Sequence, residues 1–324
     1  MIRYILKRLV QSVITILLVV SVVFLLMRLM PSDYFFTEDE LIKFTEEQKM
    51  DKLQRLGLLD PPLVQLGNFY KNMFKIEDGH LKLDLGKSMR LEKGQEVTSV
   101  IAAKIVVSGK IGLIALAVSL VLGVILGVLQ ARYKGRVIDH IGTAYTVIVN
   151  AVPHLVIYTV IMVAGSAWFN LPMRYSGRLN TGLSMVLPII CLSTGSTAGY
   201  MLWTRRYMMD ELNKDYIRLA KLKGLSDQKV MFRHVLKNAF VPLAQYLPYS
   251  ILLTVGGSLL AETFFSVPGM GPELTKAISR YDLNLVQGIV LLYATLGILG
   301  VFLGDLLMTL IDPRIKLTGK GDTR

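Results

Sequence analysis

The chain has 324 residues, of which 52% are hydrophobic and 19% are charged, and its formal net charge is +12. This composition is too apolar for an ordinary soluble domain, in which roughly a quarter of the residues are charged. The positive charge could indicate nucleic-acid binding, but the basic residues gather beside long apolar stretches, which is the pattern of a membrane protein. A soluble enzyme and a nucleic-acid-binding protein are therefore excluded.

Six apolar stretches are each long enough to cross a membrane as a helix. They cover residues 9–29, 106–131, 141–168, 183–203, 240–260 and 285–311. A helix needs about 20 residues to span a hydrocarbon core of about 30 Å. We therefore predict an all-α polytopic membrane protein with six transmembrane helices. Its parts are an amino-terminal segment 1–30, a long external loop 31–105, a five-helix core 106–311 and a tail 312–324.

The basic residues outside the spans are predicted to share one face of the membrane. They are Arg3, Lys7, Arg8, Arg132, Lys134, Arg136, Arg314, Lys316, Lys320, Arg324 and nine Lys or Arg residues between positions 203 and 241. If six spans alternate in direction, all of these clusters lie on the same side, and the positive-inside rule makes that side cytoplasmic. Both termini are then expected in the cytoplasm.

The loop 31–105 has soluble character, since it holds eleven basic and thirteen acidic residues. Its sequence predicts one helix over 38–56, ending before Gly57, and a second over 62–74, starting after Asp60-Pro61. Residues 79–97 are expected to be loop. About seventy residues suit a cap over the helix ends rather than a domain with its own core. Contact with a substrate or a delivery protein is equally open.

Glycines spaced by four residues in the spans predict close helix packing. They are Gly123 and Gly127, Gly195 and Gly199, and Gly300 and Gly304. Asp305 lies deep in the last span, and we expect it to pair with a neighbouring helix because an unpaired charge in hydrocarbon costs several kcal/mol. A proton-coupling role in an ion-driven secondary transporter would require more ionisable partners than the spans contain.

A basic loop covers residues 204–239 between the fourth and fifth spans. Apolar residues at helical spacing on both sides of Gly224 predict two short helices joined by a turn at that glycine, which can adopt a positive φ. Tyr216, Leu219 and Ala220 lie at i, i+3 and i+4 of the first of these helices. Such a pair either covers the end of a helix bundle or docks against a soluble partner, and the pattern alone leaves both open.

The sequence carries no motif with which the chain could hydrolyse ATP or hold a metal ion. No GxxxxGK[ST] phosphate loop occurs, the four histidines lack ligand spacing, and Cys191 is the only cysteine. Neither catalytic nor metal-binding residues are therefore predicted. A membrane hydrolase using Ser193 or Ser196 with His154 is conceivable, but nothing in the spacing favours it.

Several segments together resemble the peptide-permease branch of the ABC-importer permeases. AKLKG with HVLKNAFVP resembles the EAA-type cytoplasmic loop, and the other matching segments are the first 33 residues, LGLLDPPLVQLGNF, LDLGKSM, ETFFSVPGMGPEL, YDLNLVQGIVLLYA and GDLLMTLIDPRIKL. The loop departs from the general importer pattern, because Arg218 replaces a common glutamate, Leu219 the first alanine and Lys237 a common proline. The peptide branch typically carries these replacements, and the resemblance runs over nearly the whole chain.

This resemblance implies a type I ABC-importer permease fold and a transport subunit that is not an enzyme. The chain would bind no cofactor and would form half of a translocation pathway, with a second homologous permease completing a heterodimer. Two cytoplasmic ATPases, carrying ATP and Mg²⁺, would drive transport, and an extracytoplasmic binding protein would deliver substrate. The residues expected to couple to an ATPase are Asp215, Tyr216, Leu219, Ala220, Lys221, Gly224 and Leu225.

The family also implies the cargo and the location. Oligopeptides or dipeptides are the expected cargo, in the plasma membrane of a bacterium or archaeon, and nickel complexes, glutathione and oligosaccharides are the alternatives within the family. Hydroxyl groups of the fourth span would suit varied peptides because they offer hydrogen bonds without charge. They are Ser193, Thr194, Ser196 and Thr197. Hydrogen bonding between helices explains these hydroxyls equally well.

Overall fold

The computed structural model describes residues 2–77, 80–177 and 181–311, and most of these residues are helical. The long helices are α1 (Ile2–Arg28), α5 (Val97–Arg132), α6 (Val137–Ala151), α7 (His154–Phe169), α8 (Thr181–Leu212), α11 (Leu236–Val255) and α14 (Leu283–Ile311). Shorter elements are η1 (Ser32–Phe35), α2 (Glu38–Lys43), α3 (Glu46–Arg55), α4 (Pro62–Met73), β1 (Phe74–Glu77), β2 (His80–Leu83), α9 (Asp215–Leu222), α10 (Asp227–Val230), η2 (Met231–Val235), α12 (Leu259–Phe264) and α13 (Met270–Ser279).

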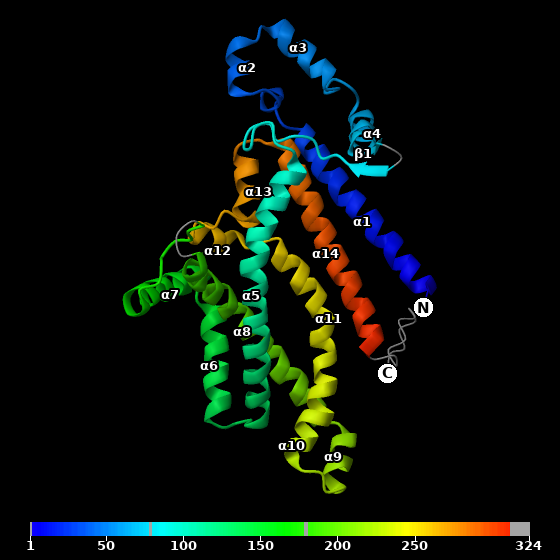
Figure 1. Ribbon diagram of the computed structural model, residues 1–324. Coiled ribbons are helices and arrows are strands. Elements are labelled where there is room, and N and C mark those ends of the chain that lie inside the picture. Colours follow the sequence, from blue (N-terminus) through cyan, green and yellow to red (C-terminus); the bar gives the residue numbers. More distant parts are fainter. Residues whose placement is uncertain (1, 78–79, 178–180, 312–324) are drawn as a thin grey trace.

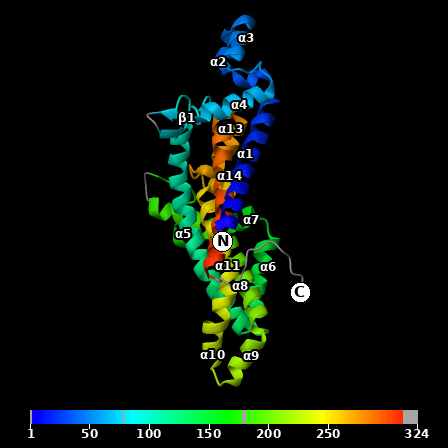
Figure 2. The same cartoon turned by 90° about the vertical axis from the view of Figure 1, so that its right-hand side faces the viewer.

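The molecule is elongated along the direction of its long helices (Figures 1 and 2). Figure 1 shows α2 and α3 at one end and α9 and α10 at the other. The start of α1 and the end of α14 both point toward the α9–α10 end. The charge pattern of the sequence predicts that this end is cytoplasmic and that the α2–α3 end is external.

Five helical segments of the described chain are long and apolar enough to span a membrane. They are Ile5–Arg28, Val97–Arg132, Gly182–Leu212, Asp227–Phe264 and Leu283–Ile311. The fold is thus the predicted all-α polytopic membrane architecture, but the third predicted span, 141–168, is not a straight helix. It consists of α6 and α7, and the helix axis bends by 112° between them.

The bend between α6 and α7 follows from Pro153. The residue before a proline is disfavoured in the helical region by a clash with the proline ring. Val152 is accordingly extended, with a ψ of 132°, and α6 ends at Ala151. Pro153 then precedes the first residue of α7. The α6–α7 pair, which is the third predicted span, is therefore either one broken span or a re-entrant segment.

The external loop differs from its prediction in two places. The predicted helix 38–56 is divided into α2 and α3, because Thr45 starts a new helix and forms a capping box with Gln48. Residues 79–97 were expected to be loop, but His80–Leu83 forms a short antiparallel hairpin with Phe74–Glu77. α4 begins at Pro62 as predicted.

Two helix pairs approach each other at glycines. A Cβ atom on Gly123 would lie 2.5 Å from the Tyr200 Cβ atom, and one on Gly127 would lie 2.6 Å from the Thr204 Cβ atom, so α5 and α8 pack with little space between their backbones. Gly300 and Gly304 likewise pack against the α11 residues Tyr249 and Gln245. These GxxxG predictions are confirmed. A Cβ atom on Gly199 would have no neighbouring atom within 4 Å, so the prediction of close helix packing is wrong at Gly199.

The external loop is fastened to the start of α14 by Asp282, which is 0% exposed. Its carboxylate accepts hydrogen bonds from the Ser88 hydroxyl (2.5 Å) and from the backbone N–H groups of Met89 (3.2 Å), Arg90 (2.9 Å), Leu91 (2.9 Å) and Leu285 (3.3 Å). Burial by itself would raise the pKa of Asp282, but the hydrogen bonds from Leu91, Ser88, Arg90 and Met89 outweigh it and hold the pKa below its ordinary value.

Asp282→Asn is expected to destabilise the external layer by about 3 kcal/mol, because a buried amide cannot accept all of these hydrogen bonds. Since the folded-state pKa is lowered, the contribution of Asp282 is present above the unfolded pKa of about 3.9 and is lost as the pH falls below it. Thermal unfolding and limited proteolysis of the loop would measure both effects. Asp51→Asn is the control, since Asp51 is half-exposed and pairs only with Arg55 on the surface; equal losses in the two variants would contradict the assignment.

Gly127→Ala is expected to destabilise the chain by about 1 to 3 kcal/mol, because the added methyl group must push α8 away from α5. Gly199→Ala should be neutral or slightly stabilising, since its Cβ position is open and alanine is the better helix former. Thermal unfolding of the two variants in the same detergent provides the comparison. Similar melting temperatures would show that the α5–α8 contact is loose.

Candidate functional site

The helices α9 and α10 form the predicted pair at the end of the bundle (Figure 1). The turn between them is a Schellman motif. Gly224 has a φ of +77°, its N–H donates to the Lys221 carbonyl (2.9 Å), and the Leu225 N–H donates to the Ala220 carbonyl (3.3 Å). The helix–turn–helix prediction around Gly224 is thus confirmed. A Cβ atom on Gly224 would have no neighbouring atom within 4 Å.

One face of α9 packs against the chain itself. Ile217 and Ala220 are buried in a cluster with Val128 of α5, Met208 of α8 and Val235 of η2. Ala220 is only 8% exposed and Leu225 packs against the same cluster. The side chains of these two predicted coupling residues therefore hold α9 in place and do not point outward.

A polar network fixes the base of α9 to α8 and α11. The Tyr216 hydroxyl donates to the Glu211 carboxylate, which also accepts from the Asn238 amide (3.1 Å) and pairs with Lys214 (2.6 Å). Burial, followed by the hydrogen bond to Glu211, raises the pKa of Tyr216 to about 12, so the phenol stays protonated at neutral pH. Glu211 and Asn238 were not singled out in the sequence, because their contacts join residues far apart along the chain.

The opposite face of α9 is exposed and partly apolar. Leu219 is 53% exposed and Leu222 is 84% exposed. Charged side chains surround them, since Asp215 pairs with Arg218 (3.6 Å) and Lys221 pairs with Asp227 (3.1 Å). Leu222 was missed in the sequence, although it lies three residues after Leu219 and therefore on the same face. We refer to Leu219 and Leu222 as the α9 apolar patch.

A groove of about 980 Å³ lies among α8, α11 and α14. Five aromatic residues line it: Tyr200, Trp203, Tyr207, Tyr246 and Tyr249. Of the four hydroxyl residues predicted for a pathway, Ser196 alone is among the lining residues. Ser193 and Thr197 are buried, and Thr194 donates to the Ile190 carbonyl (2.8 Å).

Asp305 lies at one edge of this groove and is paired, as predicted. Its carboxylate lies 3.3 Å from the Arg8 guanidinium of α1 and accepts a hydrogen bond from the Gln245 amide of α11 (3.2 Å). Both partners come from other helices, which satisfies the charge within the chain. This pairing removes the feature that suggested a proton-coupling carboxylate.

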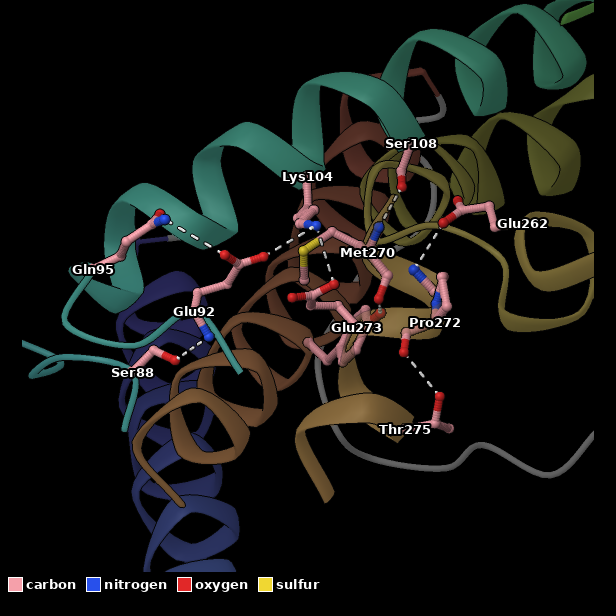
Figure 3. Close-up of polar contacts among 12 residues, drawn as sticks. Ser88, Glu92, Gln95, Lys104, Ser108, Glu262, Met270, Pro272, Glu273 and Thr275 are labelled. Carbon is pink, nitrogen blue, oxygen red and sulfur yellow. Dashed lines mark hydrogen bonds and ion pairs between the residues drawn. The ribbon is translucent and has the colours of Figure 1, made fainter. Parts of the chain in front are cut away.

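The α12–α13 segment connects α11 to α14 and is held by buried polar groups (Figure 3). Glu262 accepts hydrogen bonds from the N–H groups of Ser258 (3.0 Å) and Gly271 (2.8 Å), and the Met270 N–H donates to the Ser108 hydroxyl of α5 (2.7 Å). Figure 3 also shows Lys104 of α5 reaching Glu273 of α13, at 3.3 Å. The segment is therefore fixed to α5 at several points.

Comparison with known proteins places most of this chain in one family. The sequence profile described as "Binding-protein-dependent transport system inner membrane component" matches residues 120–317. The dipeptide transport system permease protein DppB of Bacillus subtilis is 30% identical over 99% of this chain and 100% of its own length. The oligopeptide transport system permease protein OppB of Haemophilus influenzae is 30% identical over 98% of this chain and 100% of its own length.

A third relative is longer than this chain. The oligopeptide transport system permease protein AmiC of Streptococcus pneumoniae is 38% identical over 67% of this chain, but the match spans only 44% of AmiC.

Proposed function

Because the chain belongs to the family of binding-protein-dependent transport system inner membrane components, we propose that it is a permease subunit of an ATP-driven importer. The observation that carries this proposal is the α9 apolar patch, which stands at the positively charged end of the bundle. Exposed leucines surrounded by charged residues are typical of a surface that docks a partner. A chain without a phosphate loop needs an external source of energy, and a cytoplasmic ATPase docked on α9 would supply it.

Two ATPases with ATP and Mg²⁺ would thus act from the cytoplasm, and both termini of the chain would lie on the same side. ATP-driven closure of the ATPase pair would push α9. Since Tyr216, Glu211 and Asn238 join α9 to α8 and α11, the push would reach the two helices that supply the five aromatic residues of the groove. Leu219, Leu222, Lys221 and Gly224 would form the contact.

The groove supports an assembly with a second permease. It is only partly enclosed by the chain, so a homologous subunit facing it would complete an enclosed pathway. A heterodimer would follow if that subunit is a different chain. On the external side, the loop 31–105 and the α12–α13 segment would receive a binding protein that releases the substrate.

We propose dipeptides or oligopeptides as the cargo, on the basis of the names of DppB and OppB. The groove suits such a cargo, because five aromatic side chains and the hydroxyls of Ser196, Ser250 and Thr254 can contact varied side chains without selecting one charge. Nickel complexes, glutathione and oligosaccharides are the alternatives that transport assays must separate from peptides.

Leu222→Asp and Leu219→Asp are each expected to weaken binding of the ATPase at least about tenfold, because burial of one leucine contributes about 1.5 to 3 kcal/mol. Co-purification and ATPase titration of the assembled complex would measure the loss. Leu63→Asp is a matched control, since Leu63 is 76% exposed on α4 at the other end of the molecule. Unchanged ATPase binding in the Leu222→Asp variant would refute the docking surface.

The importer assignment is tested by reconstituting the chain with its partner permease, ATPases and binding protein in liposomes. Uptake of a labelled dipeptide should require ATP and the binding protein and should stop with a non-hydrolysable ATP analogue. Liposomes with an ion gradient and no ATP are the control. Uptake under that control condition would show a secondary transporter instead.

A further inference from the structure

The external end of α1 carries a positive charge whose hydrogen-bonding groups are not used by the described chain. The guanidinium of Arg28 lies over the rings of Phe24 and Phe35, at 4.7 Å and 5.2 Å from their centroids. These contacts cover its faces, and among residues 2–77, 80–177 and 181–311 its side chain forms neither a hydrogen bond nor an ion pair. The N–H groups at its edge, which suit a bidentate oxyanion, are therefore free.

Arg28 lies where two small cavities meet. One cavity, of about 210 Å³, is bounded by α4, the Asp84–Gly86 turn and the start of α14. The other, of about 290 Å³, is bounded by η1, the segment after β2 and the same part of α14. Arg28, Asn284 and Gln287 line both cavities. Figure 2 shows α4 crossing close to the outer end of α1.

Two further side chains in the first cavity have unused polar atoms. Gln65 donates through its Nε2 atom to the Leu58 (3.0 Å) and Asp60 (2.7 Å) carbonyls, which fixes the orientation of the amide. Its Oε1 atom is buried and has no partner. Gln287 is half-buried, and its amide forms no hydrogen bond within the described chain. Arg28 and Gln287 are partly exposed, so a ligand in the cavity can reach their free N–H groups, whereas the Gln65 Oε1 atom has almost no accessible surface.

We propose that these residues form a binding site for the carboxylate end of an amino acid or short peptide, and we name Arg28, Gln65, Asn284 and Gln287 the outer polar pocket. Arg28 and Gln287 donate to the carboxylate.

The second cavity has room for the rest of such a ligand. Its walls include the apolar side chains of Met27, Phe35, Leu58 and Leu283. A small hydrophobic side chain of the bound molecule fits this lining. The pocket therefore gives the external face a site for free peptide that is separate from the groove among α8, α11 and α14. The inference rests on the proposed function only in its choice of a peptide as the ligand.

Calorimetric titration of the full chain in phosphatidylcholine nanodiscs with dialanine tests the site. Arg28→Gln should weaken binding at least about tenfold, and Gln287→Leu about fivefold, as expected for a charge-assisted and a neutral hydrogen bond. Dialanine amide, which lacks the carboxylate, should also bind at least about tenfold more weakly than dialanine. Arg55→Gln is the matched control, because Arg55 is exposed, pairs with Asp51 and lines neither cavity; it should bind as the wild type does.

The proposal is overturned if dialanine does not bind, if its amide binds equally well, or if Arg28→Gln binds like the wild type. Equal competition by inorganic phosphate, or loss of binding in phosphatidylglycerol nanodiscs, would show a general anion or lipid headgroup site and would also overturn it. Melting temperatures of the variants establish that they are folded. ATP-driven uptake by the assembled importer without Arg28-dependent binding would refute the pocket alone, whereas ATP-independent uptake with such binding would refute the importer assignment alone.

Discussion

Close backbone contact at glycines is the constraint on which the arrangement of the helices depends. Lipid tails are as apolar as leucine, so the hydrophobic effect does not draw helices together inside a bilayer, and van der Waals contact must do so. Gly123 and Gly127 bring α5 against α8, and Gly300 and Gly304 bring α14 against α11. The groove lies between members of these two pairs, so its width is set by the distance between the pairs. The two pairs also touch each other, since a Cβ atom on Gly112 of α5 would lie 2.5 Å from the Thr254 side chain of α11.

The α9 helix has one face that packs against the bundle and one face that is exposed. Ile217 and Ala220 attach it to the bundle, and the Tyr216–Glu211–Asn238 network attaches its base to α8 and α11. These contacts leave Leu219 and Leu222 outside. A short helix that is attached so firmly on one side moves with the bundle when its other side is pushed. The proposed coupling of an ATPase to the groove would require this rigidity, and it would need no contact between the ATPase and the groove.

The sequence was informative wherever local rules apply. Apolar length predicted the helical membrane architecture, Gly224 the turn after α9, and GxxxG spacing two of the three glycine contacts. The sequence did not predict features that depend on contacts between residues far apart in the chain. The bend at Pro153 was overlooked because the apolar run continues through it. The outward face of α9 could not be separated from its inward face without knowing that α5 and α8 lie beneath Ala220. The aromatic lining of the groove comes from two helices, α8, which ends at Leu212, and α11, which begins at Leu236.

The bend between α6 and α7 has a consequence for the order in which the protein is assembled. The two helices have 15 and 16 residues, and neither alone reaches the length of about 20 that a membrane span requires. Their positions rest on α8, because Arg205 binds Asp139 of α6 (2.7 Å) and Leu187 packs against Gly165 of α7. α8 follows both helices in the chain, so the bent pair can settle only after α8 has been synthesised. The α6–α7 pair therefore reaches its final position late during membrane insertion, when α8, which also lines the groove, packs against it.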